Sequence, residues 1–370
     1  MVLSRKSKSV LFFNPDYHCS FFLRDELRKR GWKAEISVGS WYPQKALWAD
    51  DVLRVRTSRF VPEHLSRWIQ TRRFRYIVHY GAMASRGGQL ERLQDWVISN
   101  LATLLRRVGI KFIYLPSGCF EHRLRAKWQL VDGGNVCGNC GFEDRCNDKA
   151  NSKNFELVRR IAQSGIAIDA HVSEEFSESR LRYKSFDLEI FSPDIEVPNE
   201  YRWPKSSSVR ILHSSSLKGR ESGGKNIKGS PYVTAAINSL RAQGIDVELV
   251  SKTSEPSRIM RFHQVQADII VDQLIYGGVG STALEGMALG RPVICYIRDS
   301  WREALGQWFP EWRTCPIISA TPDTVESEIR RLVEDADLRT HIGKESRRFA
   351  EKFLDVKRNV LELEQLLYSL

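Results

Sequence analysis

Residues 267–295, ADIIVDQLIYGGVGSTALEGMALGRPVIC, decide the fold of this chain. The stretch begins with a buried strand pattern, passes through a glycine-rich loop into a short apolar helix, and ends in a second buried strand. One carboxylate, Glu285, interrupts the helix. Strand–loop–helix units of this kind bind nucleotides and phosphates, because glycine lets the backbone approach the anion and the helix N-terminus attracts it. The stretch therefore predicts a phosphate-bearing ligand as well as a parallel sheet.

Strands and helices alternate on both sides of this stretch. In the first half we expect strands at 9–13, 34–38, 76–79, 112–115 and 166–172, and helices at 21–30, 90–108, 155–162 and 174–182. In the second half we expect strands at 209–213 and 247–250, helices at 232–243, 255–264 and 322–335, and helix formers over 337–370. The alternation predicts parallel sheets with helices on both faces.

The predicted architecture is an α/β protein with two Rossmann-like domains facing a cleft and a C-terminal helical segment. A chain of 370 residues is long enough for two hydrophobic cores. The Pro- and Ser-rich residues 191–208 predict a linker. We therefore expect an N-terminal domain at 1–200 with a cysteine-containing loop at 131–152, a second domain at 201–345, and a C-terminal helix at 346–370.

The net charge of +11 is concentrated in the first 150 residues, which carry 26 Lys and Arg against 14 Asp and Glu. The densest cluster consists of Arg54, Arg56, Arg59, Arg67, Arg72, Arg73 and Arg75. Such a cluster attracts anionic lipid head groups, nucleic acid or a polyanionic substrate, and the alternative is a solvated basic face. No apolar run approaches the ~20 residues that span a bilayer. We expect a cytoplasmic protein that can contact the inner face of a membrane, and no specific nucleic-acid partner, because no base-reading motif is present.

Three stretches resemble the GT-B glycosyltransferases, most closely the group 1 or family 4-like enzymes of polysaccharide biosynthesis. They are ILHSSS at 211–216, KNIKGSPYVTAAINSL at 225–240, and LEGMALGRPVI at 284–294. The last is similar to the family's Glu-Ala-Met-Ala-x-Gly-x-Pro-Val-Ile. The resemblance implies a GT-B fold in which the first domain binds the acceptor and the second binds the donor. It also implies transfer of a hexose from a UDP- or GDP-linked sugar, with retention, to a glycan, lipid-linked or other acceptor.

The resemblance also implies roles for residues of the second half. Glu285 would bind the ribose diol, and Lys228 would neutralise the diphosphate of the leaving group, with Lys225 as the competing candidate. A GT-B fold usually needs no divalent metal, so none is expected in catalysis. Further donor contacts are expected from Gly277, Gly278, Gly280, Ser281, Thr282, His213, Ser214 and Asp272.

Gly277 departs from the family pattern, which has a second glutamate eight residues before the ribose glutamate. The donor-sugar contact of that carboxylate must be lost or supplied elsewhere, and Asp272 and Gln273 are the nearest substitutes. This departure favours an alternative function, a GT-B scaffold that has lost transfer and acts as a binding or assembly protein. A basic nucleic-acid-binding protein is a third interpretation.

Polar residues also follow strands of the first half. Asp16 lies in the loop after the first expected strand, and His79 ends another. Either could assist deprotonation of the acceptor, and a purely structural role is the alternative for each.

Cysteines gather in the first half as the CGNC sequence of Cys137 and Cys140, with Cys146 downstream and Cys119 upstream. A Cys-x-x-Cys turn with a third thiolate nearby suits a structural zinc ion, for which Cys119 is the preferred fourth ligand and His122 the alternative. Unliganded thiols and a disulfide or redox pair are the other interpretations. We expect the site to shape the acceptor domain rather than to catalyse.

Overall fold

The structure is a computed structural model. It describes residues 8–15, 18–39, 48–54, 63–81, 89–116, 124–133, 135–141, 148–162, 164–168, 179–215, 221–222, 225–253 and 255–370. The chain forms two compact units. The first comprises Met1–Lys127, Asp144–Ser185 and Val356–Leu370, and the second Trp128–Glu143 and Phe186–Asp355.

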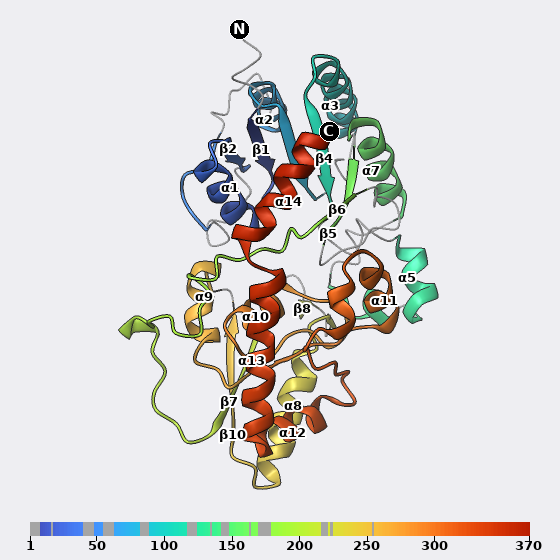
Figure 1. Ribbon diagram of the computed structural model, residues 1–370. Helices are drawn as coiled ribbons and strands as arrows, with labels where there is room; N and C mark the ends of the chain where they lie inside the picture. Colours follow the sequence, from blue (N-terminus) through green and yellow to red (C-terminus); the bar gives the residue numbers. More distant parts are fainter. Residues whose placement is uncertain are drawn as a thin grey trace. The chain divides into compact units, whose positions relative to one another are not determined.

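A six-stranded parallel sheet in the order β2-β1-β3-β4-β5-β6 forms the centre of the first unit (Figure 1). Its strands are β1 (Ser9–Phe13), β2 (Lys33–Ser37), β3 (Tyr76–Tyr80), β4 (Lys111–Leu115), β5 (Ser164–Ile168) and β6 (Ser179–Leu181). All five residues of β1, SVLFF, are buried. A run without polar alternation is expected for a parallel strand that is covered on both faces.

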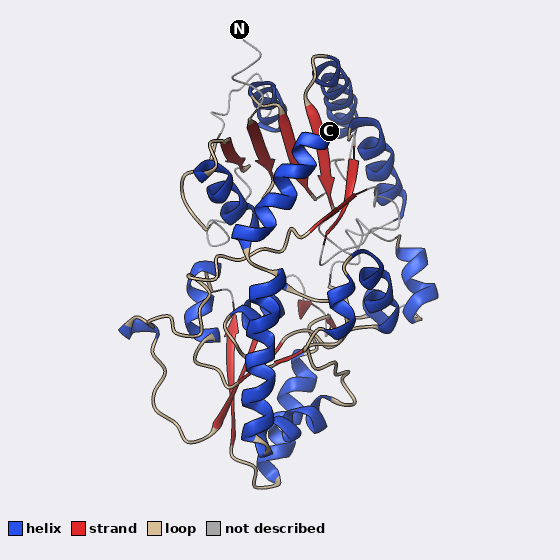
Figure 2. Cartoon of the chain, viewed as in Figure 1, coloured by secondary structure: helices blue, strands red, loops and turns tan. Residues whose placement is uncertain are grey.

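Helices cover both faces of this sheet (Figure 2). They are α1 (Cys19–Lys29), α2 (Glu63–Gln70), α3 (Gln89–Arg107), α7 (Asp148–Ile161) and α14 (Val356–Ser369), with a 3₁₀ turn η2 at Thr71–Arg73. Leu11 and Phe13 of β1 join one core cluster with Trp68 of α2, Ile98 of α3 and Val158 of α7. Helices α1 and α14 pack against each other on the other side.

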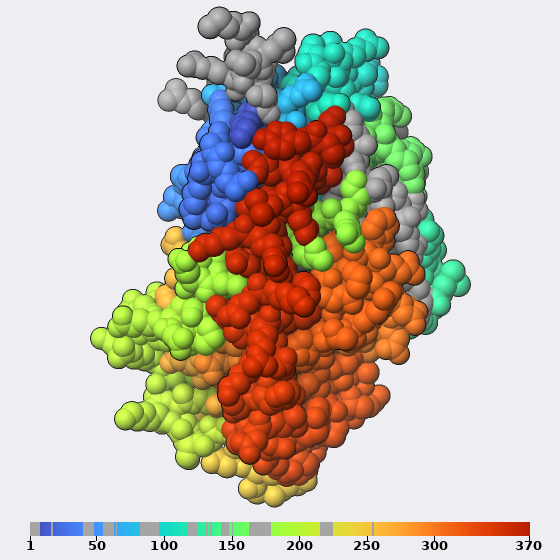
Figure 3. All heavy atoms as spheres, viewed as in Figure 1, coloured from blue at the N-terminus to red at the C-terminus, as the bar shows by residue number. Residues whose placement is uncertain are grey.

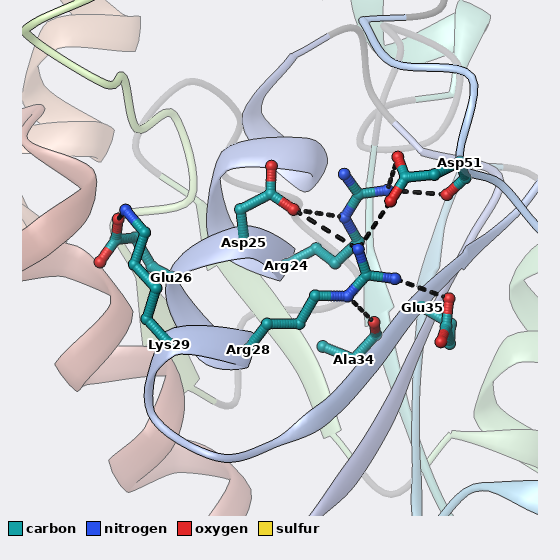
Figure 4. A network of polar contacts seen from close by, with 8 residues as sticks. All are labelled: Arg24, Asp25, Glu26, Arg28, Lys29, Ala34, Glu35 and Asp51. Atoms are coloured by element: carbon teal, nitrogen blue, oxygen red, sulfur yellow. Dashed lines mark hydrogen bonds and ion pairs between the residues drawn. The ribbon is translucent and has the colours of Figure 1, made fainter.

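A network of charged side chains fixes α1 to neighbouring segments of the first unit (Figure 4). Arg28 donates to the carbonyl of Ala34 at 2.8 Å, to Glu35 at 2.8 Å and to Asp51 at 2.7 Å. Arg24, which is buried, pairs with the other oxygen of Asp51 at 2.8 Å. Burial raises the pKa of the Asp51 carboxyl, but the two arginines outweigh it and lower this pKa.

The second unit has a four-stranded parallel sheet in the order β10-β7-β11-β12. Its strands are β7 (Val209–Ser215), β10 (Val247–Thr253), β11 (Ile269–Val271) and β12 (Val293–Ile294), with a short antiparallel pair of β8 (Glu221–Ser222) and β9 (Lys225–Asn226). Its helices are α8 (Ser230–Ala242), α9 (Ser257–Gln264), α10 (Ser281–Ala288), α11 (Asp299–Trp308), α12 (Val325–Glu334) and α13 (Ala336–Phe353), with 3₁₀ turns η4 (Asn199–Tyr201) and η6 (Pro310–Thr314). Gly286 lets α10 approach the sheet, because a Cβ there would lie 2.8 Å from Ile270 and 3.0 Å from Val293.

Residues 128–143 belong to the second unit although they lie within the first half of the sequence. They include the end of α5 (Arg125–Asp132) and all of α6 (Asn135–Gly138). Asp132 pairs with Arg298 at 3.3 Å, and the ring of Trp128 lies 5.8 Å from that of Tyr276. The cysteine-containing segment thus lies partly beside the glycine-rich loop of the second unit.

Two secondary-structure predictions differ from the structure. A helix was expected over 174–182, but Ser179–Leu181 form β6, because pairing with β5 overrides local helix propensity. The helical run over 337–370 is two helices, α13 and α14, which belong to different units. None of the helices in the described ranges is long and apolar enough to cross a membrane.

Candidate functional site

Lys228 and Asp272 form a buried ion pair in the second unit. The Lys228 ammonium contacts Oδ1 of Asp272, and these residues are 7% and 0% exposed. The backbone supports this contact, since the Leu274 amide donates to the Lys228 carbonyl at 3.1 Å. Gly229 makes the close approach possible: its φ is +78°, and a Cβ there would lie 2.9 Å from Leu274. Two sequence segments are therefore brought together at the carboxyl end of β11.

Asp272 also reaches the N-terminus of α10. A Cβ on Gly280, the residue before the helix, would lie 2.5 Å from Oδ2 of Asp272. This buried oxygen has no hydrogen-bond partner within the described ranges. Ser281 and Thr282 form the first turn of α10, and no side chain caps it. Since the first amides of a helix lack intrahelical partners, a positive dipole end and the Lys228 ammonium lie on the two sides of one carboxylate.

Glu285 lies one turn further along α10 and is 7% exposed. Its Oε2 accepts a hydrogen bond of 2.6 Å from Nε2 of Gln264, at the end of α9. The glutamate is therefore not a solvated helix residue but a carboxylate held in place by a neighbouring amide. Lys225, the competing candidate to Lys228, lies in β9 and is partly buried.

His213 connects three elements of the second unit. Its Nδ1 lies 2.9 Å from the Val271 carbonyl, and its Nε2 lies 2.8 Å from Oγ of Ser230, the first residue of α8. Because a carbonyl only accepts, Nδ1 carries a proton, and in the neutral ring Nε2 accepts from the serine hydroxyl. His213 and Ser214 are both buried at the carboxyl half of β7.

The backbone and a neighbouring side chain explain the missing glutamate at Gly277. Its φ is +76°, and a Cβ there would lie 2.9 Å from Nη2 of Arg298. Arg298 in turn donates to the Tyr276 carbonyl at 3.2 Å and packs over the ring of Trp128, 5.1 Å from its centroid. A guanidinium thus borders this part of the loop. Sequence reasoning missed Arg298 and Asp132, whose pairing joins residues far apart in the chain.

The rest of the glycine loop is also crowded. A Cβ on Gly278 would lie 3.0 Å from the indole nitrogen of Trp301. Nε2 of Gln273 donates to the Gly278 carbonyl at 2.5 Å, which fixes the loop against the end of β11. Cys295, fully buried nearby, has its pKa raised by burial and by Asp272, so it is a neutral thiol.

The candidates of the first unit have different positions. His79 is 0% exposed, and its ring stacks on Phe13 at 5.1 Å between centroids. Asp16 lies outside the described residues. The ring of His79 also stacks on Trp68, with 6.1 Å between centroids, so this histidine lies in the core of the first unit.

Arg67, one of the seven arginines of the expected basic cluster, is buried and does not contribute to an exposed surface. Arg67 is 1% exposed, and its Nη2 donates to Oδ1 of Asn14 at 2.7 Å and to the Ser37 carbonyl at 2.9 Å. Burial lowers its pKa to about 10, so the guanidinium remains charged at neutral pH. Arg54, Arg72 and Arg73 are exposed, whereas Arg56 and Arg59 lie outside the described residues.

The predicted zinc site is only partly described. Cys137 and Cys140 lie on and just after α6, where the Cys140 amide donates to the Cys137 carbonyl at 3.3 Å. Cys119, His122 and Cys146 lie outside the described residues. Among the residues that are described, no three His, Cys, Asp or Glu side chains are arranged to hold a metal ion. The zinc ligands remain a prediction.

No protein-family model matches the chain, and no curated protein sequence matches it. Solved structures do. A sucrose-phosphate synthase from Thermosynechococcus elongatus superposes with a TM-score of 0.60 and 13% identity, covering 98% of each chain. HepE from Anabaena, solved with UDP-glucose, gives 0.56 and 12%, covering 98% of this chain and 100% of its own. WaaG, a glycosyltransferase of lipopolysaccharide biosynthesis, gives 0.52 and 13%, covering 97% and 99%.

These similarities extend over nearly the whole chain, and they show its fold. The two parallel-sheet units have the fold of the GT-B glycosyltransferases. The predicted α/β fold class is confirmed. At identities of 11–14% the similarity shows the fold alone. The roles of individual residues are therefore argued from the site geometry described above.

Proposed function

We propose that this protein is a glycosyltransferase that uses a nucleotide-diphosphate sugar as donor. The observation that carries the proposal is the cluster of Lys228, Asp272, the N-terminus of α10 and Glu285 in one unit of a GT-B fold. The carboxyl ends of parallel strands are the usual ligand-binding edge of α/β sheets. The solved complexes of HepE with UDP-glucose and with UDP support a uridine nucleotide as the first candidate donor.

The charges of Lys228, Glu285 and the N-terminus of α10 suggest which part of the donor each would bind. The diphosphate would lie against the Lys228 ammonium and the first backbone amides of α10, at Ser281 and Thr282, which offset the negative charge that develops on the leaving nucleotide. A lysine ammonium has three donors, so Lys228 can bind a phosphate oxygen while it keeps Asp272. Glu285 would accept hydrogen bonds from the ribose hydroxyls. Lys228 is thus the proposed catalytic residue, and the glycines of the loop leave room for the donor.

The finer assignments belong to the same proposal. We propose a hexosyl transfer with retention, to a glycan or lipid-linked acceptor bound by the first unit. The exposed Arg54, Arg72 and Arg73 support contact with an anionic membrane surface at the cytoplasmic face. The Cys-x-x-Cys sequence of Cys137 and Cys140 supports a structural zinc ion, with Cys119 and Cys146 as the other ligands.

Calorimetric titration with UDP and GDP tests the donor site. In Glu285→Ala we expect UDP binding to weaken roughly 10- to 100-fold, since hydrogen bonds to a charged group are lost. The sharper readout uses UDP without its ribose hydroxyls. The intact protein should bind this analogue much more weakly than UDP, whereas Glu285→Ala should bind both equally. Lys205→Ala, an exposed lysine of the same unit, is the control.

Lys228 needs a paired comparison, because its removal leaves the Asp272 carboxylate buried without its partner. Lys228→Met with Asp272→Asn removes both charges together. We expect the double variant to fold and to lose both UDP binding and donor hydrolysis. Unchanged transfer in this variant and in Glu285→Ala would refute the assigned roles.

A binding protein without transfer activity is the second candidate function. Gly277 favours it, because Arg298 stands beside the position of the family's sugar-side glutamate. UDP binding without hydrolysis of any nucleotide sugar would support this alternative. Absence of all nucleotide binding would exclude both the enzyme and a nucleotide-binding scaffold.

A further inference from the structure

The second unit has a cavity of about 490 Å³ away from the candidate site. It is bordered by Pro193, Asp268, Gly290, Arg291, Pro292, Arg339, Thr340, Gly343, Lys344, Arg347 and Arg348. Asp268 directly precedes β11 and Pro292 directly precedes β12, so the cavity lies at the amino ends of these parallel strands. Lys228 and Asp272 lie at the opposite, carboxyl edge of the same sheet. The cavity is therefore distinct from the proposed donor site.

Cationic side chains dominate the cavity. Five lining residues are Arg or Lys, and Asp268 is the one acidic residue among them. In Figure 3 the atoms of α13, in orange-red and red, lie on the surface next to those of residues 186–200, in yellow-green. Arg347 joins these two segments, since it donates to the carbonyls of Phe191 and Ala288, both at 2.6 Å. It also pairs with Glu351 at 2.8 Å, so its own charge is offset.

Two other lining arginines are likewise engaged within the protein. Arg339 donates to the carbonyl of Leu332 at 2.6 Å, and Arg348 pairs with Glu345. Arg291 and Lys344 differ from these three arginines in having no such contact within the described residues.

The side chains of Arg291 and Lys344 have neither an ion pair nor a hydrogen bond within the described part of the chain. The buried Nε of Arg291 finds no hydrogen-bond partner among the described residues, although Arg291 as a whole is only partly buried. Burial lowers the pKa of Arg291, while the charges of Asp268 and Asp194 raise it. A buried donor without a partner is costly, and native structures satisfy such groups with water, an ion or a ligand.

Two glycines also line the cavity, Gly290 and Gly343. Gly290 has a φ of +69°, and a Cβ on Gly343 would lie 2.5 Å from the Gly290 carbonyl. The backbones of α13 and of the turn after α10 therefore touch directly. The volume falls within the range of clefts that bind small ligands.

We propose that this cavity is a second anion-binding site, which holds the phosphate or pyrophosphate group of a small metabolite between Arg291 and Lys344. A pocket of this size beside a partly buried arginine suits a small ligand better than a flat lipid surface. The site goes beyond the proposed transfer reaction and does not depend on it. Helix α10 begins at the proposed donor site and ends beside this cavity, so one element is shared by the two.

Titration with pyrophosphate tests the site. Arg291→Gln and Lys344→Gln should each weaken pyrophosphate binding at least tenfold relative to the intact protein. Lys352→Gln, an exposed lysine of the same helix outside the cavity, should leave it unchanged. Any pyrophosphate bound near Lys228 is common to all these proteins, so the difference reports the cavity alone. Lys344 is exposed, so its variant remains informative if Arg291→Gln fails to fold.

Sedimentation with phosphatidylglycerol vesicles distinguishes a lipid head group from a free phosphate compound. We expect both cavity variants to bind vesicles as the intact protein does. Loss of vesicle binding with unchanged pyrophosphate affinity would overturn the proposal in favour of a lipid site. Equal pyrophosphate affinity in the intact protein, both cavity variants and the Lys352 control would also overturn it.

Discussion

Gly277 is constrained in two ways at the residue scale, by a left-handed backbone and by the nearby Arg298. We expect Gly277→Ala to lower the free energy of unfolding by about 1 kcal/mol for the positive φ and by about 1–3 kcal/mol more for the crowding. Denaturant titration measures the sum. If the variant is as stable as the intact protein, the proposed reason for the missing glutamate is wrong.

Gly244 separates these two contributions. Its φ is +83°, but no atom of the described residues lies within 4 Å of a Cβ placed there. Gly244→Ala should therefore cost only the backbone contribution of about 1 kcal/mol. In a protein that already carries Arg298→Ala, adding Gly277→Ala should no longer cost the crowding contribution. The added loss of unfolding free energy should then match that of Gly244→Ala.

His263 makes stability depend on pH. Burial and the charge of Lys252 lower its pKa, although Glu255 raises it, and Nδ1 accepts a hydrogen bond of 3.0 Å from the Trp203 indole. Below a pH of about 6.5 the unfolded chain binds a proton that the folded imidazole does not, so this contribution to stability is lost as the pH falls. The free energy of unfolding of His263→Gln, measured between pH 5 and 8, should depend less steeply on pH. An identical pH dependence in both proteins would exclude this role.

At the scale of elements, Glu364 anchors α14 to the first unit. Its Oε1 accepts from the Trp32 indole at 2.7 Å, and its Oε2 accepts from Nε of Arg30 at 2.8 Å. Burial raises the pKa of Glu364, but these donors and the charge of Arg30 outweigh it and lower this pKa.

We expect Glu364→Gln to lower the free energy of unfolding by about 1–2 kcal/mol at neutral pH, since one buried contact loses its charge. Because the folded pKa is depressed, the contribution is present above the unfolded value and is lost as the pH falls below it. The gap between the variant and the intact protein should therefore close in acid. Gln365→Ala, an exposed change on the same helix, should show no such closing gap.

The sequence predicted elements best where burial on both faces leaves a continuous apolar run. The strand expected at 9–13 is β1, and the turn-marked strand, loop and helix of 267–295 are β11, the glycine loop, α10 and β12. It missed α2, EHLSRWIQ, because Arg67 is polar in sequence yet buried in the fold. β6 has only three residues, SRL, and its extended form depends on its pairing with β5.

The sequence singled out two of the candidate residues for a related reason. Lys228 and Glu285 lie next to glycines whose positions already indicate a turn, so local pattern was enough to select them. The Lys228–Asp272 contact and the Arg298–Asp132 pair join segments 44 and 166 residues apart. No local pattern encodes such contacts, so the buried state of Asp272 and the reason for Gly277 required the structure.

At the scale of the whole molecule, α14 is the last part of the chain but belongs to the first unit. Removing residues 356–370 should expose the side of the sheet that carries α1, while the second unit keeps its own core. Hydrogen exchange followed by mass spectrometry should show lost protection in β1 and β2 and retained protection in β7 and β11. Equal loss of protection in both sheets would contradict the division into two units.

The path of the chain has a consequence for how the protein is made. It passes between the units four times, after Lys127, Glu143, Ser185 and Asp355. The strands of the first sheet are synthesised early, but the helix that carries Glu364 emerges from the ribosome only after the whole second unit has been synthesised. The face beside α1 is therefore incomplete for most of translation, and it is the surface on which a chaperone acting on the nascent chain would have most effect.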